Sequence, residues 1–198
     1  MNQSSSHSAV SVPPPEGGNA VGVPNREWFI AIVRNNTECS CCDKLSKLGY
    51  DCFAATQVEN IKNQSGKMTA KTRVILPSTI FIYVNESERK QVVSLPYVNK
   101  FMTDRASTKD CFNRHSLAKI PAAQIERLRF MLGHSDSPVS IVERHFQIGD
   151  RVRIIRGSLK GLEGNISRSP NKTILYIDLD MLGCATVQID PVNAEYIK

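Results

Sequence analysis

The chain has 198 residues and a formal net charge of +6, with 41% hydrophobic and 22% charged residues. This length allows one large domain or two small ones, and the composition is that of a globular protein. No apolar run reaches the roughly 18 residues of a membrane-spanning helix, so we expect no membrane contact.

The first 25 residues differ from the rest. They contain runs of three serines and three prolines, and Glu16 is their only charged residue. Such a segment buries too little apolar surface to offset the entropy lost on ordering, so we expect residues 1–25 to form a disordered tail. The segment also lacks the basic start and apolar run of a secretory signal, which favours a cytoplasmic, monomeric protein with reduced thiols.

Residues 26–132 predict an α+β domain in which helices pack on an antiparallel sheet. Strands are expected at 28–33, 50–59, 71–84 and 97–104, and helices at 38–48, 87–95 and 121–132. Thr37 can cap the first helix and Gly49 can end it. Pro77 should bend the long strand, because proline cannot donate to a strand ladder. Gly133 is expected to end the last helix.

Residues 133–145 have the polar, irregular composition of a linker, and 146–198 predict a small closed β-barrel. Short strands are expected at 151–155, 162–167, 173–180 and 184–189. Gly157, Gly161 and Gly164 stand where loops need unusual backbone angles or close approach of two chains.

The chain has six cysteines, which could bind a metal or act in redox chemistry, but their spacing favours neither role. They are Cys39, Cys41, Cys42, Cys52, Cys111 and Cys184. A second Cys or His pair at zinc-finger spacing is missing. On a helix, Cys41 or Cys42 would line up with Leu45 and Leu48, so packing is favoured over metal binding or redox use. We expect no metal and no cofactor.

No sequence motif indicates an enzyme. The four histidines are scattered over the tail, a loop and the linker, and no phosphate-binding loop or zinc-protease motif occurs. Residues 26–132 hold 17 Lys/Arg against 10 Asp/Glu, whereas 146–198 hold 7 against 6. The basic surplus of the larger part permits nucleic-acid binding, and an ordinary solvated basic face explains it equally well.

Four segments together resemble the NusG family of transcription elongation factors. WFIAIV (28–33) is similar to the family's opening strand, RVILPSTIFIYV (73–84) to its proline-containing strand, and LPYVNKFM (95–102) to a later run. The segment 149–164 matches its KOW motif at Gly149-Asp150, Lys160-Gly161 and Gly164. The resemblance implies a NusG-type N-terminal domain followed by a small SH3-like KOW β-barrel.

The run IPAAQIERLRFMLGHSDSPV (120–139) resembles the specialised UpxY-type paralogues, which act on capsular or surface polysaccharide operons in Bacteroides and its relatives. The family implication is transcription antitermination at such an operon. Ser78-Thr79 replaces the Gly-Tyr that usually follows the proline. Two alternatives remain: a general NusG-like elongation factor, and a KOW-containing RNA-binding protein associated with the ribosome.

The resemblance further implies an apolar surface that binds the clamp helices of the largest RNA polymerase subunit. By position in the family motifs, its candidates are Ile32, Leu76, Pro77, Thr79 and Phe81. For Leu76 and Phe81 the alternative from the residues alone is a core position, since most large apolar side chains are buried.

Basic residues at other matching positions are candidates for contact with non-template DNA or nascent RNA. They are Arg34, Lys71, Arg73, Arg89 and Lys90. Met181 and Leu182 lie in the loop that resembles the KOW contact surface for ribosomal protein S10 or Rho. Leu182 and Cys184 replace the Phe and Arg often found there, which leaves the partner of this loop open.

Overall fold

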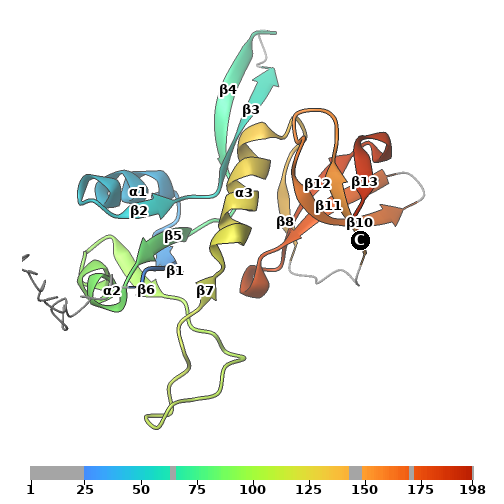
Figure 1. Ribbon diagram of the computed structural model, residues 1–198. Coiled ribbons are helices and arrows are strands. Elements are labelled where there is room, and N and C mark those ends of the chain that lie inside the picture. The colour runs from blue at the N-terminus through green and yellow to red at the C-terminus, as the bar shows by residue number, and fades with distance from the viewer. Residues whose placement is uncertain (1–24, 63–65, 143–148, 170–171, 198) are drawn as a thin grey trace, which may run out of the picture.

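The computed structural model describes residues 25–62, 66–142, 149–169 and 172–197, and the expected disordered tail lies outside them apart from Asn25. Three antiparallel sheets and three α-helices make up the described part, which confirms the α+β class. Figure 1 shows two units on either side of helix α3: an N-terminal unit from β1 to α3, and a C-terminal unit from β8 to β13.

The main sheet of the N-terminal unit has the strand order β2-β5-β1-β6, with β7 also pairing with β1. Its strands are β1 (Glu27–Val33), β2 (Asp51–Phe53), β5 (Thr79–Val84), β6 (Val98–Phe101) and β7 (Lys119–Ile120). One face packs against α1 (Glu38–Lys47) and α2 (Glu86–Val93), and the other against α3 (Ala122–His134). Side chains alternate between these two faces along β1, so Phe29 and Ile30 belong to different cores.

Two long predicted strands each divide into two. The segment 50–59 forms β2 and the start of β3 (Thr56–Lys62), and 71–84 forms the end of β4 (Met68–Val74) and then β5. β3 and β4 pair only with each other and make a hairpin that projects from the main sheet (Figure 1). The expected bend at Pro77 is present, and here the chain changes sheets as well as direction.

Helix α1 begins where Thr37 was expected to cap it, but the Thr37 side chain does not cap. Its hydroxyl donates instead to the carbonyl of Arg34, at 2.6 Å. Cys41 and Leu45 are buried as expected, whereas Leu48 is exposed. Gly49 follows the helix with a positive φ of 86°, which glycine adopts without strain.

Helix α3 does not end at Gly133, as the sequence had suggested, but continues to His134. The N–H of Ser135 still donates to the carbonyl of Met131, at 3.0 Å, and the ring of His134 stacks on Phe130. These contacts continue the helical pattern past the glycine. Part of the expected linker is therefore helical, and residues 140–142 form strand β8 (Ser140–Val142); residues 143–145 lie outside the described part.

The C-terminal unit is one strongly curved sheet in the order β13-β9-β10-β11-β12-β8. Its remaining strands are β9 (Asp150–Ile154), β10 (Glu163–Ser169), β11 (Lys172–Asp178), β12 (Cys184–Ile189) and β13 (Ala194–Tyr196). Within the described residues no ladder joins β13 to β8, so the sheet is not the closed barrel we expected. Strand β8, from the expected linker, occupies the edge of β12.

All three glycines singled out in the C-terminal unit meet the expected demands, and Gly157 has a positive φ of 83°. Gly161 has a positive φ of 91° in the loop between β9 and β10. A Cβ atom on Gly164 would lie 2.8 Å from the carbonyl oxygen of Tyr176, so only glycine allows β10 and β11 to approach this closely.

Candidate functional site

The turn between β4 and β5 holds the centre of the predicted apolar surface. Ser78 has a positive φ of 57°, a conformation that favours glycine. Its carbonyl accepts from the N–H of Val33 at 2.9 Å, and its N–H donates to the carboxylate of Glu38 at 2.6 Å. Glu38 is 1% exposed, so a buried carboxylate from α1 fixes this turn. Glu38 is not among the residues predicted from the sequence.

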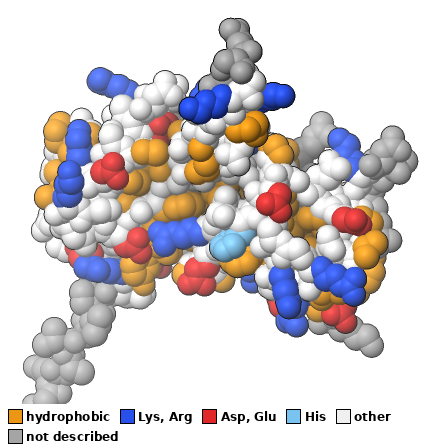
Figure 2. All heavy atoms as spheres, turned by 90° about the horizontal axis from the view of Figure 1, so that it is seen from above, with side chains coloured by type: hydrophobic (Ala, Val, Ile, Leu, Met, Phe, Trp, Pro, Cys, Tyr) orange, Lys and Arg blue, Asp and Glu red, His pale blue; other side chains and the backbone are white. Residues whose placement is uncertain are grey.

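Four of the five predicted apolar contact residues lie together around this turn. Ile32 and Thr79 are cross-strand partners in β1 and β5, and Leu76 and Pro77 belong to the turn itself. Pro77 is exposed and Ile32 and Leu76 are half-buried, whereas Thr79 is buried with its hydroxyl on the Pro77 carbonyl, at 3.1 Å. Figure 2 shows hydrophobic side chains gathered in the hollow middle of one face, with many charged side chains toward its margins.

Phe81, the fifth candidate, is fully buried in the core. It pairs with Ile30 across β1 and stacks on Phe53, with 5.8 Å between the ring centroids. In this structure Phe81 is a core residue and is not accessible to a partner.

Helix α3 covers this aromatic end of the sheet through Arg129. The Arg129 guanidinium lies 4.8 Å from the ring centroids of both Trp28 and Phe53. One of its terminal nitrogens is 3.2 Å from the carboxylate of Asp51. Arg129 is half-buried, and these cation–π contacts add to the apolar contacts that hold α3 on the sheet.

The basic candidates fall in three separate places. Arg34 follows β1, Lys71 and Arg73 lie on the projecting hairpin, and Arg89 and Lys90 lie on α2. Figure 1 shows the hairpin and α2 at opposite ends of the N-terminal unit, so these residues do not form one continuous patch. The Arg73 guanidinium forms an ion pair with the Glu59 carboxylate, at 2.5 Å. Part of its charge is therefore compensated within the hairpin.

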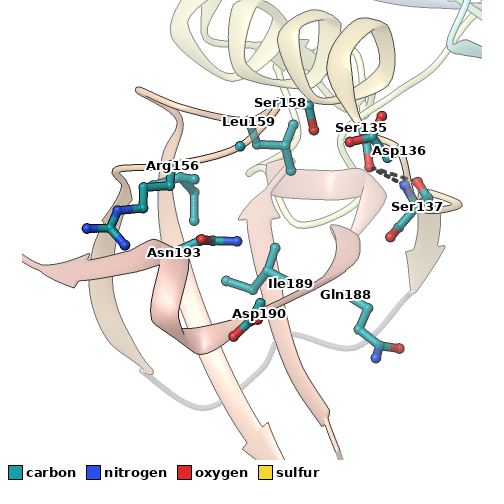
Figure 3. A pocket seen from close by; sticks show the side chains of 12 residues that line it. Ser135, Asp136, Ser137, Arg156, Ser158, Leu159, Gln188, Ile189, Asp190 and Asn193 are labelled. Atoms are coloured by element: carbon teal, nitrogen blue, oxygen red, sulfur yellow. Dashed lines mark hydrogen bonds between the residues drawn. The ribbon is translucent and has the colours of Figure 1, made fainter.

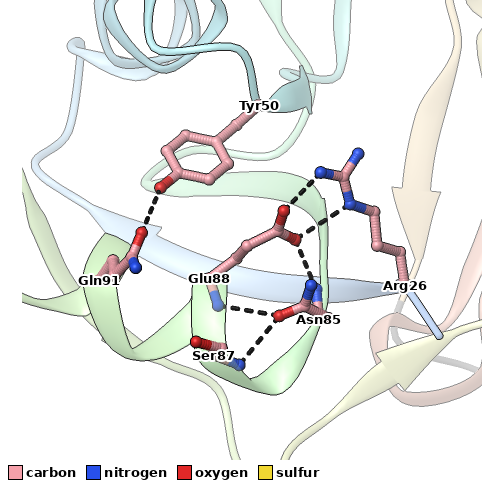
Figure 4. Close-up of polar contacts among 6 residues, drawn as sticks. All are labelled: Arg26, Tyr50, Asn85, Ser87, Glu88 and Gln91. Atoms are coloured by element: carbon pink, nitrogen blue, oxygen red, sulfur yellow. Dashed lines mark hydrogen bonds and ion pairs between the residues drawn. The ribbon is translucent and has the colours of Figure 1, made fainter. Parts of the chain in front are cut away.

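Helix α2 is held in place by a capping box. The Asn85 side chain accepts from the N–H groups of Ser87 and Glu88, and the Glu88 carboxylate accepts from the N–H of Asn85 (Figure 4). Glu88 also pairs with Arg26, which precedes β1. The hydrogen bonds from Arg26 and from the Asn85 backbone lower the pKa of Glu88. This network fixes the position of Arg89, which bonds Glu86 through Nε at 2.8 Å.

The predicted KOW partner loop lies at the contact between the two units. Met181 and Leu182 belong to the short 3-10 helix η1 (Asp180–Leu182); Met181 is 38% exposed and Leu182 packs against the core. The Gln124 amide, on α3, donates to the carboxylate of Asp180 at 2.9 Å. The two units therefore touch through α3, which contacts both β3 and β11.

Gln57, to which the sequence also gave no role, fixes the segment that joins the two units. Its amide nitrogen donates to the carbonyls of Ser135 and Ser137, and its oxygen accepts from the N–H of Val139 at 2.9 Å. The carbonyl of Val139 accepts in turn from Arg73, at 2.7 Å. Gln57 is 3% exposed, so the segment after α3 is fixed to the base of the hairpin.

Next to Gln57, the connecting segment and the C-terminal unit line a half-open polar pocket of about 180 Å³. Ser135, Asp136 and Ser137 line one side of it, and Arg156 and Asn193 of the C-terminal unit line the other (Figure 3). The cavity contains no arrangement of a nucleophile with a base.

The cysteines show no metal or redox centre within the described residues. All six are free, and no group of three or more His, Cys, Asp or Glu side chains there could hold a metal ion. A hydrogen bond with the Cys42 thiol raises the pKa of Cys52, and burial raises it further. A thiol held in this neutral form is a poor nucleophile, consistent with a packing role. No helix in the described part is long and apolar enough to cross a membrane.

Comparison with known proteins yields structural neighbours only. No protein-family model and no curated protein matches the sequence. A structure of Thermotoga maritima NusG that concerns its domain interaction is 17% identical over 87% of this chain and 98% of that chain, with a TM-score of 0.43.

Two conformations of the MjSpt4:Spt5 complex are also similar. Conformation A is 12% identical and covers 86% of this chain and 98% of that chain, with a TM-score of 0.26. Conformation B is 14% identical and covers 86% and 97%, with a TM-score of 0.27.

Proposed function

We propose that this chain is a NusG-like transcription factor that binds RNA polymerase and promotes read-through of a surface or capsular polysaccharide operon. The observation that carries the proposal is where the four family-like segments lie. WFIAIV forms most of β1, RVILPSTIFIYV ends in β5, and LPYVNKFM contains β6; these strands are neighbours in the order β5-β1-β6. The KOW-like segment supplies β9 and the start of β10, which pair with each other.

The proposed polymerase contact is the apolar surface of Ile32, Leu76 and Pro77 beside the Ser78 turn. A helix of a partner protein binds where apolar side chains are accessible in a shallow depression, and these three are exposed or half-buried. The buried Glu38 holds the turn in one conformation, so little entropy is lost when a partner binds it. The clamp helices of the polymerase are the proposed partner.

The test is co-purification of the full chain with RNA polymerase. Leu76→Asp is expected to weaken binding by about tenfold or more, because it places a charge in the centre of an apolar contact. Phe81→Asp is unsuitable, since it would put a carboxylate into the core. Val192→Asp on the C-terminal unit is the matched control, because Val192 is 67% exposed and distant in the chain. A folded Leu76→Asp variant that binds like the wild type would exclude this surface.

The specialised and general forms of the proposal differ in how many transcripts they affect. Depletion of the protein is expected to reduce the distal transcripts of one polysaccharide operon. Changes across the whole transcriptome would instead support a general elongation factor.

The ribosome-associated RNA-binding alternative is disfavoured by the charges of the C-terminal unit. Arg151 and Arg153 share the carboxylate of Glu163, at 3.0 and 2.5 Å, so one of these two positive charges is compensated within the unit. Steeply salt-dependent RNA binding that is lost in an Arg151→Ala, Arg153→Ala variant would revive this alternative.

A further inference from the structure

The half-open polar pocket combines an apolar patch with hydrogen-bonding groups. Leu159, in the loop between β9 and β10, and Ile189, at the end of β12, form the apolar patch. Polar groups come from Ser137 in the connecting segment and from Asn193 in the 3-10 helix η2 (Pro191–Asn193). Figure 3 shows the Asn193 side chain pointing toward the middle of the pocket. Small-molecule sites have this composition, an apolar lining with a few placed polar groups.

The Asn193 side chain is available to a ligand, because the fold uses only the backbone of this residue. Its N–H donates to the carbonyl of Asp190 at 3.0 Å, and its carbonyl accepts from the N–H of Ile155 at 2.8 Å. The residue is half-buried, yet within the described part of the chain its side-chain amide makes no hydrogen bond. An amide side chain carries both donors and an acceptor, so this one can bond a hydroxyl group in either direction.

Ser137 is held in the same way, through its backbone. Its carbonyl accepts from the Gln57 amide at 2.9 Å, and its N–H donates to the Ser135 hydroxyl at 3.2 Å. The Ser137 hydroxyl itself has no partner among the residues that the structure describes. Both sides of the pocket are therefore fixed by contacts that leave its polar side chains unused. A ligand bound there would lose little free energy to ordering the protein.

The charges around the pocket favour an uncharged ligand. Asp136 and Asp190 line it together with Arg156, so an anion would meet two carboxylates and one guanidinium. Figure 3 shows the Arg156 side chain pointing away from the middle of the pocket. The Asp190 carboxylate already accepts from the N–H of Val192, at 3.0 Å. No aromatic side chain is among the described residues that line the pocket, so a nucleobase would find no ring to stack on.

We propose that this pocket binds one sugar ring of an uncharged carbohydrate. A pyranose ring has C–H groups on its faces and hydroxyl groups around its edge. The ring lies on Leu159 and Ile189, and its hydroxyls bond the Asn193 amide and the Ser137 hydroxyl, which both donate and accept. The volume of about 180 Å³, that of roughly six water molecules in the liquid, limits the ligand to about one such ring.

A sugar in this position bridges the connecting segment and the C-terminal unit. Under the proposed function, it would report the supply of sugars for a polysaccharide operon. That consequence rests on the proposed function, whereas the binding itself does not and is measured on the purified chain.

Two-dimensional amide NMR spectra of the full chain test the proposal. The probes are glucose, galactose and N-acetylglucosamine, with inorganic phosphate as an anion and spermidine as a cation. At least one sugar is expected to shift the signals of the Asn193 side-chain amide and of the Ser137 and Leu159 backbone N–H groups. The dissociation constant should be on the order of 1 mM, as is usual for a ligand of this size. Phosphate and spermidine should leave these signals in place.

Asn193→Leu keeps the size of the side chain but removes its donors and its acceptor. It is expected to weaken sugar binding by about tenfold, because hydroxyls of the bound sugar are left unpaired. Ser137→Ala removes one hydroxyl and should weaken binding by about 2- to 12-fold. Neither side chain bonds the described part of the fold, so both variants should unfold at the temperature of the wild type. Asn60→Leu, at an exposed position of the hairpin, is the matched control and should bind like the wild type.

The proposal is overturned if none of the three sugars shifts the pocket signals at tens of times the expected dissociation constant. It is also overturned if phosphate or spermidine shifts them as much as a sugar does, because the pocket then binds an ion. Sugar binding by Asn193→Leu as tight as that of the wild type would place the ligand elsewhere. The Leu76→Asp co-purification is a separate measurement, so a failure of the polymerase proposal would be recognised independently.

Discussion

The carboxylate of Glu38 accepts a 2.6 Å hydrogen bond from the backbone N–H of Ser78, 40 residues further along the chain. It also accepts from the N–H of Asn36, at 3.3 Å. One buried side chain thus joins the end of β1, the start of α1 and the turn before β5. The conformation of the proposed polymerase-binding turn depends on it.

Glu38→Ala is therefore expected to lower the free energy of unfolding by about 1–3 kcal/mol, because it leaves the part-buried N–H of Ser78 without its acceptor. Glu38→Gln keeps an oxygen acceptor and should cost less. Urea unfolding measures both changes. Asp43→Ala, at an exposed position of the same helix, serves as the control; equal losses in Asp43→Ala and Glu38→Ala would contradict the role given to Glu38.

Ser78 adopts a left-handed backbone conformation that costs a non-glycine residue about 1–2 kcal/mol. Ser78→Gly removes this cost but increases the entropy of the unfolded chain. A gain of about 0.5–1 kcal/mol in the free energy of unfolding is expected, whereas Ser78→Val should lose at least about 1 kcal/mol, because a β-branched side chain tolerates this conformation poorly. Thermal unfolding of the wild type and both variants ranks their stabilities. A Ser78→Val variant that is more stable than the wild type would refute the argument.

Arg129 lies against Trp28, which is the only tryptophan in the chain and is 7% exposed. Arg129→Ala is expected to loosen α3 from the sheet and to shift the tryptophan emission to longer wavelength. The accompanying loss of stability should be about 1–3 kcal/mol, since a stacked and ion-paired guanidinium is removed. Glu126→Ala, on the exposed side of α3, should leave the emission unchanged. An unshifted spectrum in Arg129→Ala would mean that Arg129 does not fasten the helix.

The capping of α2 predicts a specific sensitivity to acid. The pKa of Glu88 in the folded protein is below its ordinary value of 4.5, because Arg26 and the N–H of Asn85 bond its carboxylate. The stabilisation is complete above pH 4.5 and is lost as the pH falls through the lowered pKa. Glu88→Gln should therefore lose less stability than the wild type between neutral pH and values below 4.5. Urea midpoints at stepped pH test this, and parallel curves for the two proteins would count against it.

Much of the fold follows from apolar periodicity in the sequence. β1, α1 and α2 lie within one residue or two of the expected ranges, as do most strands of the C-terminal unit. Periodicity cannot show which strand a segment pairs with, so the separation of β3 and β4 from the main sheet was not predicted. Their residues alternate like those of the main sheet, but they leave that sheet after Phe53 and return to it at Thr79.

The candidate site was partly predictable from the sequence. Ile32, Leu76 and Pro77 were assigned to one surface by family resemblance and lie close together around one turn. Glu38 and Gln57 were not found, because an acidic residue at a helix start and a single glutamine in a strand also occur as ordinary solvated side chains. Only the fold brings the Ser78 N–H and the Val139 backbone to them.

Strand β8 has a practical consequence for dissecting the protein. A fragment that starts at residue 146, where the sequence places the domain boundary, would omit Ser140–Val142 and leave the edge of β12 unpaired. That edge includes Cys184 and Ala185, which are buried in the intact chain. Unpaired edges of this kind promote association between molecules, so oligomers of such a fragment would reflect the cut and not the native protein. A fragment that begins before Ser140 would keep the edge covered.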